Sequence, residues 1–155
     1  MLNQHTTIPN QNDSEPSTIG PLLLVEDNRD DAQLIQRLIN RQFPQLATEW
    51  LWQAEQVIPY LENALQSSCL PSLVLLDLYL PGAQRGLQVL QAIKSHQAYQ
   101  QIPVVILSRS QDPEDMATAL SYSATAYLVK PESPQQWLSE LAWVQQYANP
   151  TGTPA

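Results

Sequence analysis

Short runs of consecutive apolar residues recur along the chain, and a polar or charged residue follows each run directly. Apolar runs without alternation are typical of strands that are buried on both faces of a parallel sheet. The pattern predicts four such strands, at 22–25, 73–76, 103–107 and 126–129. A shorter strand is predicted at 48–53, with Trp50 and Trp52 on one face, where packing on the sheet is a simpler interpretation than a ligand platform.

Between the strands, apolar residues recur at helical spacing, which predicts a helix after each strand. The last two helices have the clearest start signals. Asp112 is suited to cap one of them, with Pro113 at its first position, and Ser133 begins a capping box that Gln136 completes. This alternation favours an α/β fold, a doubly wound five-stranded parallel sheet with helices on both faces. Among the topologies that right-handed crossovers permit, the flavodoxin-like order 2-1-3-4-5 is the common one.

Composition excludes several classes of protein. The formal net charge is −8, with only seven Lys and Arg, so the chain is a poor candidate for binding nucleic acid. No apolar run reaches the length of a transmembrane helix, and the N-terminus lacks the apolar segment of a signal peptide. A single cysteine, Cys69, excludes an internal disulfide and a multi-cysteine metal site. We therefore expect a cytoplasmic protein without a membrane partner.

The polar and proline-containing ends of the chain differ from the region between them. We expect a flexible leader at 1–20, one folded domain at 21–148 and a flexible tail at 149–155. No basic recognition helix is present and no second domain fits after residue 148. The sequence therefore predicts an output through protein contacts rather than through DNA.

Polar side chains follow four of the predicted strands, at the ends that meet along one edge of the sheet. They are Glu26, Asp27, Asp77, Ser108 and Lys130. Three close carboxylates repel one another unless a cation shares them, and hard oxygen ligands in small number suit Mg²⁺. A lysine amine and a serine hydroxyl suit an anion. The anion that needs all of these around an aspartate is a phosphoryl group on Asp77.

Each of these residues also has a simpler interpretation. Asp77 could cap the turn at Pro81 and Gly82, and the acidic pair Glu26-Asp27 could begin a helix. Ser108 could cap a loop, and Lys130 could be a solvated surface charge. The phosphoryl interpretation is favoured because all four strand ends carry suitable residues together.

Four ordered motifs then resemble one family. The first motif ends at Asp27, the second surrounds Asp77, the third ends at Ser108, and the fourth runs from Tyr127 to Pro131. Over about residues 21 to 148 the chain resembles the receiver domain of bacterial two-component response regulators, in their stand-alone, chemotaxis-type form. The segments after the acidic pair and around Ser108 resemble those of cyanobacterial members.

The resemblance implies a role for each matching residue. Asp77 would be the phosphoacceptor and Lys130 the partner of the phosphoryl group. Asp27 would bind Mg²⁺ directly and Glu26 mostly through water, with Asp77 and the Tyr79 backbone carbonyl as further ligands. Ser108 would be the hydroxyl switch and Tyr127 the aromatic switch residue.

The sequence departs from the family pattern in two places. The segment from Pro81 to Gly86 is one residue longer than usual, which leaves the loop at 82–85 open. Ser123-Ala124 stands where receivers usually have Gly-Ala. Ser123 must therefore either adopt a left-handed conformation or leave the helix in another way.

Other functions are compatible with the same fold class. A haloacid-dehalogenase-type phosphatase needs an aspartate two residues after the nucleophile, where this chain has Tyr79. A flavin or nucleotide binder would want a glycine-rich phosphate loop, which the four glycines do not form. A pseudo-receiver that acts only as an interaction module usually lacks the aspartate, the acidic pair or the lysine, and all are kept here. The favoured function is a non-enzymatic signalling receiver that a histidine kinase or phosphotransfer protein phosphorylates and that binds a downstream protein.

The final helix predicts where a partner binds. On a helical wheel, Trp137, Leu138, Leu141, Ala142, Val144 and Ala148 fall on the side expected to pack on the sheet. Trp143 and Tyr147 point the opposite way, so we expect them to be exposed and to contact a homodimer partner or a target protein. The open alternative is that the tail folds back and covers them.

Overall fold

Five parallel strands form one sheet, in the spatial order β2-β1-β3-β4-β5. The strands are β1 (Leu22–Val25), β2 (Thr48–Leu51), β3 (Leu73–Asp77), β4 (Val104–Ser108) and β5 (Ala126–Val129). The computed structural model describes residues 19–82 and 85–148. All strand pairs are parallel, which confirms the predicted fold class and strand order.

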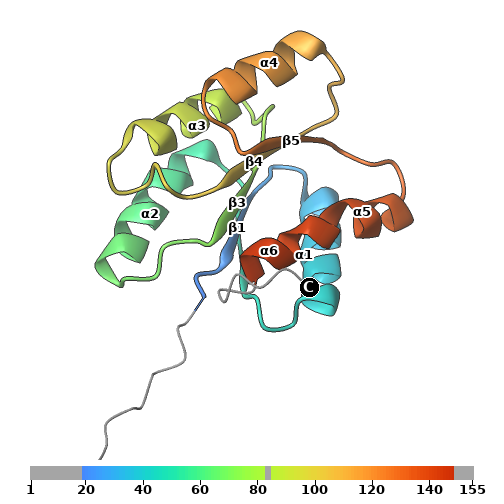
Figure 1. Cartoon of the computed structure of the whole chain (residues 1–155), viewed down its shortest axis with the longest axis horizontal. Coiled ribbons are helices and arrows are strands. Elements are labelled where there is room, and N and C mark those ends of the chain that lie inside the picture. Colours follow the sequence, from blue (N-terminus) through green and yellow to red (C-terminus); the bar gives the residue numbers. More distant parts are fainter. Residues whose placement is uncertain (1–18, 83–84, 149–155) are drawn as a thin grey trace, which may run out of the picture.

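Helices cover both faces of the sheet (Figure 1). One face carries α2 (Val57–Gln66), α3 (Arg85–Ser95) and α4 (Pro113–Ser121), with the short 3-10 turn η1 (Ala54–Gln56) before α2. The opposite face carries α1 (Arg29–Gln42) and three C-terminal segments. These segments are α5 (Pro134–Glu140), η2 (Leu141–Val144) and α6 (Gln145–Ala148). Within the described ranges, no helix is long and apolar enough to cross a membrane.

The three central strands explain why their sequences are apolar without alternation. Every residue of β1, β3 and β4 is buried, because successive side chains point into helical layers on opposite faces. Leu23 and Leu76 pack toward α2 and α3, whereas Leu24 and Leu75 pack toward α1 and the C-terminal segments. The two edge strands are less buried, as expected where one side of a strand has no neighbour.

Only some of the predicted domain boundaries fall within the residues that the structure describes. The predicted tail at 149–155, residues 1–18 of the predicted leader, and loop residues 83–84 lie outside the described residues. Ile19, which we assigned to the leader, packs against the hydrophobic cluster beneath α1. Its apolar side chain suits burial, and the boundary at residue 21 stays a prediction.

The orientation predicted for Trp143 and Tyr147 was wrong. Both side chains are half-buried, pack against the cluster beneath α1, and meet each other edge to face with ring centroids 6.0 Å apart. Leu138, which we expected to be buried, is 38% exposed, and Ala142 is also exposed. The buried arc is narrower than predicted: the fully buried residues, Trp137, Leu141, Val144 and Ala148, recur at helical spacing. Trp143 and Tyr147 flank this arc instead of lying opposite it, and Leu138 and Ala142 lie outside it.

The turn after α4 shows which backbone conformation Ser123 adopts. This serine adopts a left-handed backbone with φ 67°, the conformation for which glycine is usually selected. Its N–H donates to Leu120 O, and the next N–H, of Ala124, donates to Ala119 O. Ser123 therefore ends α4 in the manner of a C-terminal glycine and leads into β5.

Candidate functional site

The ends of four strands bring the predicted site residues together. Parallel register aligns Val25 with Leu76 and Asp77 with Leu107, so the residues that follow β1 and β3 emerge at the same edge. Lys130 follows β5, and its backbone N–H donates to Ser108 O at 2.7 Å. The buried strands therefore fix where each side chain of the site begins.

Lys130 lies at the centre of the buried charged group. Its Nζ is 2.6 Å from Glu26 Oε2, 3.2 Å from Asp31 Oδ2 and 3.4 Å from Asp77 Oδ2. Nζ donates aligned hydrogen bonds to Asp31 and Asp77, whereas its contact with Glu26 is a close ion pair without that alignment. Lys130 is 8% exposed, Asp77 5% and Glu26 0%, so these charges interact away from bulk water.

Burial and neighbouring charge change the proton affinity of this group. Burial and the Asp77 carboxylate raise the pKa of Glu26 to about 8, against the opposing effect of Lys130. Burial lowers the pKa of the Lys130 ammonium, but the Asp77 and Glu26 carboxylates outweigh it, and the net pKa is raised. The ammonium therefore stays charged at neutral pH, whereas the Glu26 carboxyl is mostly protonated there.

The carboxylates of Glu26, Asp27 and Asp77 fit a divalent cation. One oxygen of each lies within 4.8 Å of the others, and Asp27 is exposed while the other two are buried. Glu26 Oε1 accepts from Asn28 N, which leaves Oε2 as the oxygen turned toward Lys130. Three hard oxygen donors, one reachable from solvent, suit Mg²⁺, which keeps several waters when bound.

The edge strand β2 supports the acidic pair from behind. Trp50 Nε1 donates to the backbone O of Glu26 at 2.8 Å, and Glu26 N donates to Leu51 O at 3.0 Å. Trp50 is half-buried against the sheet, as predicted, whereas Trp52 lies beyond the strand and is 50% exposed. Both backbone groups of Glu26 are thus fixed by one neighbouring strand.

The predicted switch residues do not contact Asp77 directly. Ser108 is fully buried, and its Oγ accepts from Ser110 N at 3.0 Å. The Tyr127 hydroxyl donates to Ser110 O at 2.9 Å, and its ring is partly buried against the core. Ser110 therefore contacts both predicted switch residues within one loop.

A second network joins the loop after β3 to α4. Asp115 Oδ2 accepts from the Tyr79 hydroxyl and from Ser110 Oγ, each at 2.5 Å. These two hydrogen bonds lower the pKa of Asp115, and donation to Asp115 raises the pKa of Tyr79. The Tyr79 backbone N–H donates to Asp77 Oδ1, so this loop contacts both the acceptor carboxylate and α4.

Sequence reasoning did not single out Asp31, Arg109 or Asp115. Asp31 Oδ2 accepts from Arg109 Nη2 at 3.0 Å as well as from Lys130. Its only sequence signal is a place in the first helical turn after the acidic pair, where acidic residues are common for other reasons. Arg109 directly follows Ser108, but nothing in the sequence indicates that it pairs across to α1.

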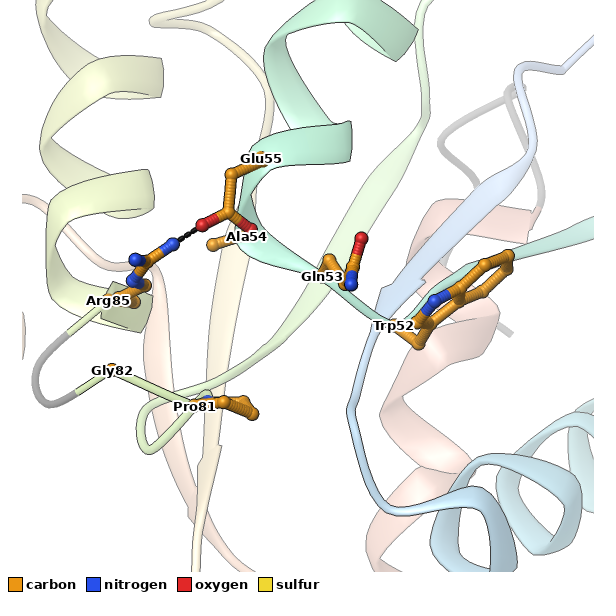
Figure 2. A pocket seen from close by; sticks show the side chains of 7 residues that line it. All are labelled: Trp52, Gln53, Ala54, Glu55, Pro81, Gly82 and Arg85. Atoms are coloured by element: carbon orange, nitrogen blue, oxygen red, sulfur yellow. Dashed lines mark ion pairs between the residues drawn. The ribbon is translucent and has the colours of Figure 1, made fainter.

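One surface hollow borders the site and another lies apart from it. One of about 460 Å³ lies beside Lys130, Arg109 and Glu132 and is a polar approach to the lysine. Figure 2 shows another, of about 340 Å³, between the segment 52–55 and the turn at Pro81–Gly82, where Arg85 and Glu55 form an ion pair. The second hollow includes none of the buried charged residues and is separate from the chemistry at Asp77.

Fold and sequence together define the class of this protein. The family profile described as "Response regulator receiver domain" matches residues 22–142, most of the chain. The chain therefore belongs to the response regulator receiver domain family, a family of signalling proteins, as its four motifs predicted.

Named relatives agree with this assignment. The chain is 35% identical over 127 residues to the Probable methanogenesis regulatory protein FilR2 of Methanothrix harundinacea, covering 81% of each sequence. It is 31% identical over 111 residues to the response regulator Rcp1 of Synechocystis sp., covering 70% of this chain and 75% of Rcp1. The likeness to Rcp1 agrees with the predicted cyanobacterial character.

Solved structures show the same fold. The phosphorylated cyanobacterial phytochrome response regulator RcpA matches with a TM-score of 0.75 and 28% identity, over 88% of this chain and 99% of that one. The Mn²⁺-bound form of Rcp1 matches with a TM-score of 0.73 and 27% identity, again over 88% of this chain and 99% of that one. One neighbour is thus a phosphorylated protein and another carries a divalent metal.

Proposed function

We propose that this chain is a response regulator that accepts a phosphoryl group on Asp77 from a histidine kinase or a phosphotransfer protein. One observation carries the proposal: the Lys130 ammonium is hydrogen-bonded to Asp77 inside a buried group that also contains Glu26. A lysine and several carboxyl groups, brought together at strand ends, suit an anion and a cation in the same site.

The transfer needs little covalent chemistry from the protein. An Asp77 carboxylate oxygen attacks the phosphorus of the donor's phosphohistidine, the P–N bond breaks, and the electron pair leaves with the histidine nitrogen. Lys130, already aimed at Asp77, donates to a phosphoryl oxygen as charge gathers there. Later attack by water on the phosphorus breaks the bond to Asp77 and releases inorganic phosphate.

We propose four ligands for Mg²⁺: Asp27, Asp77, Glu26 and the backbone carbonyl of Tyr79. When bound, the ion would neutralise charge on the phosphoryl oxygens. The clustering of the three carboxylates supports the proposal, as does the Mn²⁺-bound state of the similar protein Rcp1. Asp27 is the exposed member of the cluster, which agrees with its proposed role as the direct ligand.

Ser108 and Tyr127 are proposed to transmit the phosphorylated state. Ser108 would exchange its bond with Ser110 N for one with a phosphoryl oxygen, and this exchange would release Ser110. Because Tyr127 is bonded to the carbonyl of the same Ser110, release would also free Tyr127 to turn inward. Retention of phosphorylation but loss of the Tyr127 NMR shift change in Ser108→Ala would support this route; an unchanged shift response would contradict it.

The proposed output is contact with a downstream protein, in the cytoplasm and without nucleic acid or membrane. The domain assignment 21–148 also stays a proposal. The interface role of Trp143 and Tyr147 stays a prediction, now for side chains that are half-buried and that present only part of their rings to a homodimer or target. Unchanged association after Trp143→Ala, measured by analytical ultracentrifugation with and without phosphorylation, would contradict that role.

Phosphorylation by a small donor tests the proposed function. With Mg²⁺ and acetyl phosphate, we expect the parent protein to gain one phosphoryl group, detected by intact-mass spectrometry. Asp77→Asn should gain none, because an amide is not a competent nucleophile.

Asp30→Asn is the matched control, since Asp30 is an exposed carboxylate near the site and the substitution removes the same charge. We expect it to be phosphorylated like the parent. Phosphorylation of Asp77→Asn to the parent level would refute the acceptor. Absence of phosphorylation in the parent, from acetyl phosphate and from kinases alike, would favour the pseudo-receiver alternative.

A further inference from the structure

Among the described residues, Asp31 is the one carboxylate paired with Lys130 that lies outside the cluster suited to a metal. The metal-suited group consists of Glu26, Asp27 and Asp77. Asp31 comes from the first turn of α1, and its Oδ2 is 3.2 Å from Lys130 Nζ, where it accepts an aligned hydrogen bond. Its influence on the lysine can therefore be separated from binding of the cation.

The hydrogen bonds of Lys130 set the orientation of its ammonium group. An ammonium has three N–H donors, and in this site the aligned bonds go to Asp31 and Asp77. With Asp31 holding one donor, another is turned toward Asp77, where a phosphoryl oxygen would lie. Without Asp31, the long lysine side chain would keep its charge but lose one of the two bonds that orient it.

Asp31 is itself held in place by two independent features. Asn28 caps α1, and its Oδ1 accepts from Asp31 N at 3.0 Å. Arg109 Nη2 also donates to Asp31 Oδ2, at 3.0 Å. The carboxylate is mostly buried, with a side-chain exposure of 15%, so water competes weakly for it.

From this geometry we infer that Asp31 is a positioning residue for phosphoryl transfer, which acts by orienting the Lys130 ammonium toward the phosphoryl group on Asp77. The inference rests on the proposed function. It assigns Asp31 a task distinct from metal binding: Asp31 touches neither the acceptor oxygen nor the phosphoryl group and acts only through the lysine.

Beryllium fluoride, a phosphoryl mimic, provides a test that does not depend on turnover. Its dissociation constant is measured by ¹⁹F NMR at saturating Mg²⁺, and Mg²⁺ affinity is measured separately by calorimetry. Asp31→Asn keeps an acceptor oxygen but removes the charge that strengthens its bond with Lys130, which predicts that this variant binds the mimic about tenfold more weakly than the parent. Asp30→Asn, which removes the same charge from the same helical turn without a contact to Lys130, should change the affinity less than about twofold.

A double-mutant cycle separates orientation of Lys130 from a general effect on the fold. In a Lys130→Met background, adding Asp31→Asn should cause no further loss, because the residue through which Asp31 acts is gone. Asp31→Ser, with circular dichroism and thermal unfolding as checks on folding, should repeat the result of Asp31→Asn.

The outcomes distinguish this inference from the proposed function. Binding by Asp31→Asn as tight as by Asp30→Asn would overturn the positioning role, and so would an equal loss with and without Lys130. If the parent protein itself fails to bind the mimic in the presence of Mg²⁺, the proposed function fails and the role of Asp31 fails with it.

Discussion

Ser123 illustrates how a single residue departs from its family without changing the fold. Its left-handed backbone costs a non-glycine residue about 1–2 kcal/mol, part of which glycine gives back through a more flexible unfolded chain. We therefore expect Ser123→Gly to raise the free energy of unfolding by about 0.5–1 kcal/mol. Urea unfolding followed by circular dichroism measures the difference.

Ser121→Gly is the control for this prediction. It lies two residues earlier, still within α4, where glycine lowers the free energy of unfolding by up to about 1 kcal/mol. Effects of opposite sign at positions 121 and 123 would show that the gain in stability at position 123 comes from its left-handed backbone. A loss of stability in both variants would contradict that explanation.

At the same scale, residue type and strand position predicted most of the candidate site. Glu26, Asp77 and Lys130 could be placed together because each directly follows a run of apolar residues, and parallel strands end at one edge. Asp31 could not be found in this way, since its contact with Lys130 depends on the direction of α1 relative to β5. The bond between Ser108 Oγ and Ser110 N was also not predictable, because it depends on the conformation of one short loop.

Among the elements, α4 and the loop after β3 are joined by the bond between Tyr79 and Asp115. The pKa of Asp115 is lowered, so its contribution is present above its ordinary value and is lost as the pH falls through the lowered pKa. The pKa of Tyr79 is raised, so its contribution is present below about 10 and is lost as the pH rises through the raised pKa. The contact should therefore persist between about pH 4 and pH 10.

An NMR titration of Tyr79 tests this contact. In Asp115→Asn the pKa of Tyr79 should fall back toward about 10, because the carboxylate acceptor is gone. Asp112→Asn is the matched control, since asparagine also caps helices well and the Asp112 carboxylate accepts from Glu114 N, outside the contact with Tyr79. The backbone N–H of Asp112, which donates to Ser110 Oγ, is kept in this variant. An equally raised Tyr79 pKa in all three proteins would show that the bond does not form in solution.

The last helix shows where prediction from pattern fails at the level of an element. Its start was correct, since Ser133 Oγ accepts from Gln136 N as a capping residue should. Its exposed face was wrong, because Leu138 and Ala142 were counted with the buried side for being apolar, although both are exposed and the buried residues form a narrower arc. Local side-chain chemistry determined the cap, whereas packing against α1 and the sheet determines the course of the helix.

For the whole molecule, the order of elements and the burial of the strands were sufficient to predict the fold. Continuous apolar runs require cover on both faces, and right-handed crossovers then leave few arrangements. The same arrangement explains the electrostatics of the site: the sheet removes Glu26 and Asp77 from water, and this burial raises the pKa of Glu26 against the opposing effect of Lys130. An acidic site of this kind agrees with a receiver that binds a cation and then a phosphoryl group.

The central claim is that the phosphoryl group is carried by Asp77, and chemical trapping tests it directly. Borohydride reduces an aspartyl phosphate to homoserine, which marks the modified position in a peptide map read by mass spectrometry. After treatment with acetyl phosphate and Mg²⁺, we predict homoserine at position 77, with the other aspartates unchanged. Homoserine at another acidic residue, or a phosphorylated protein that yields none at position 77, would contradict the account.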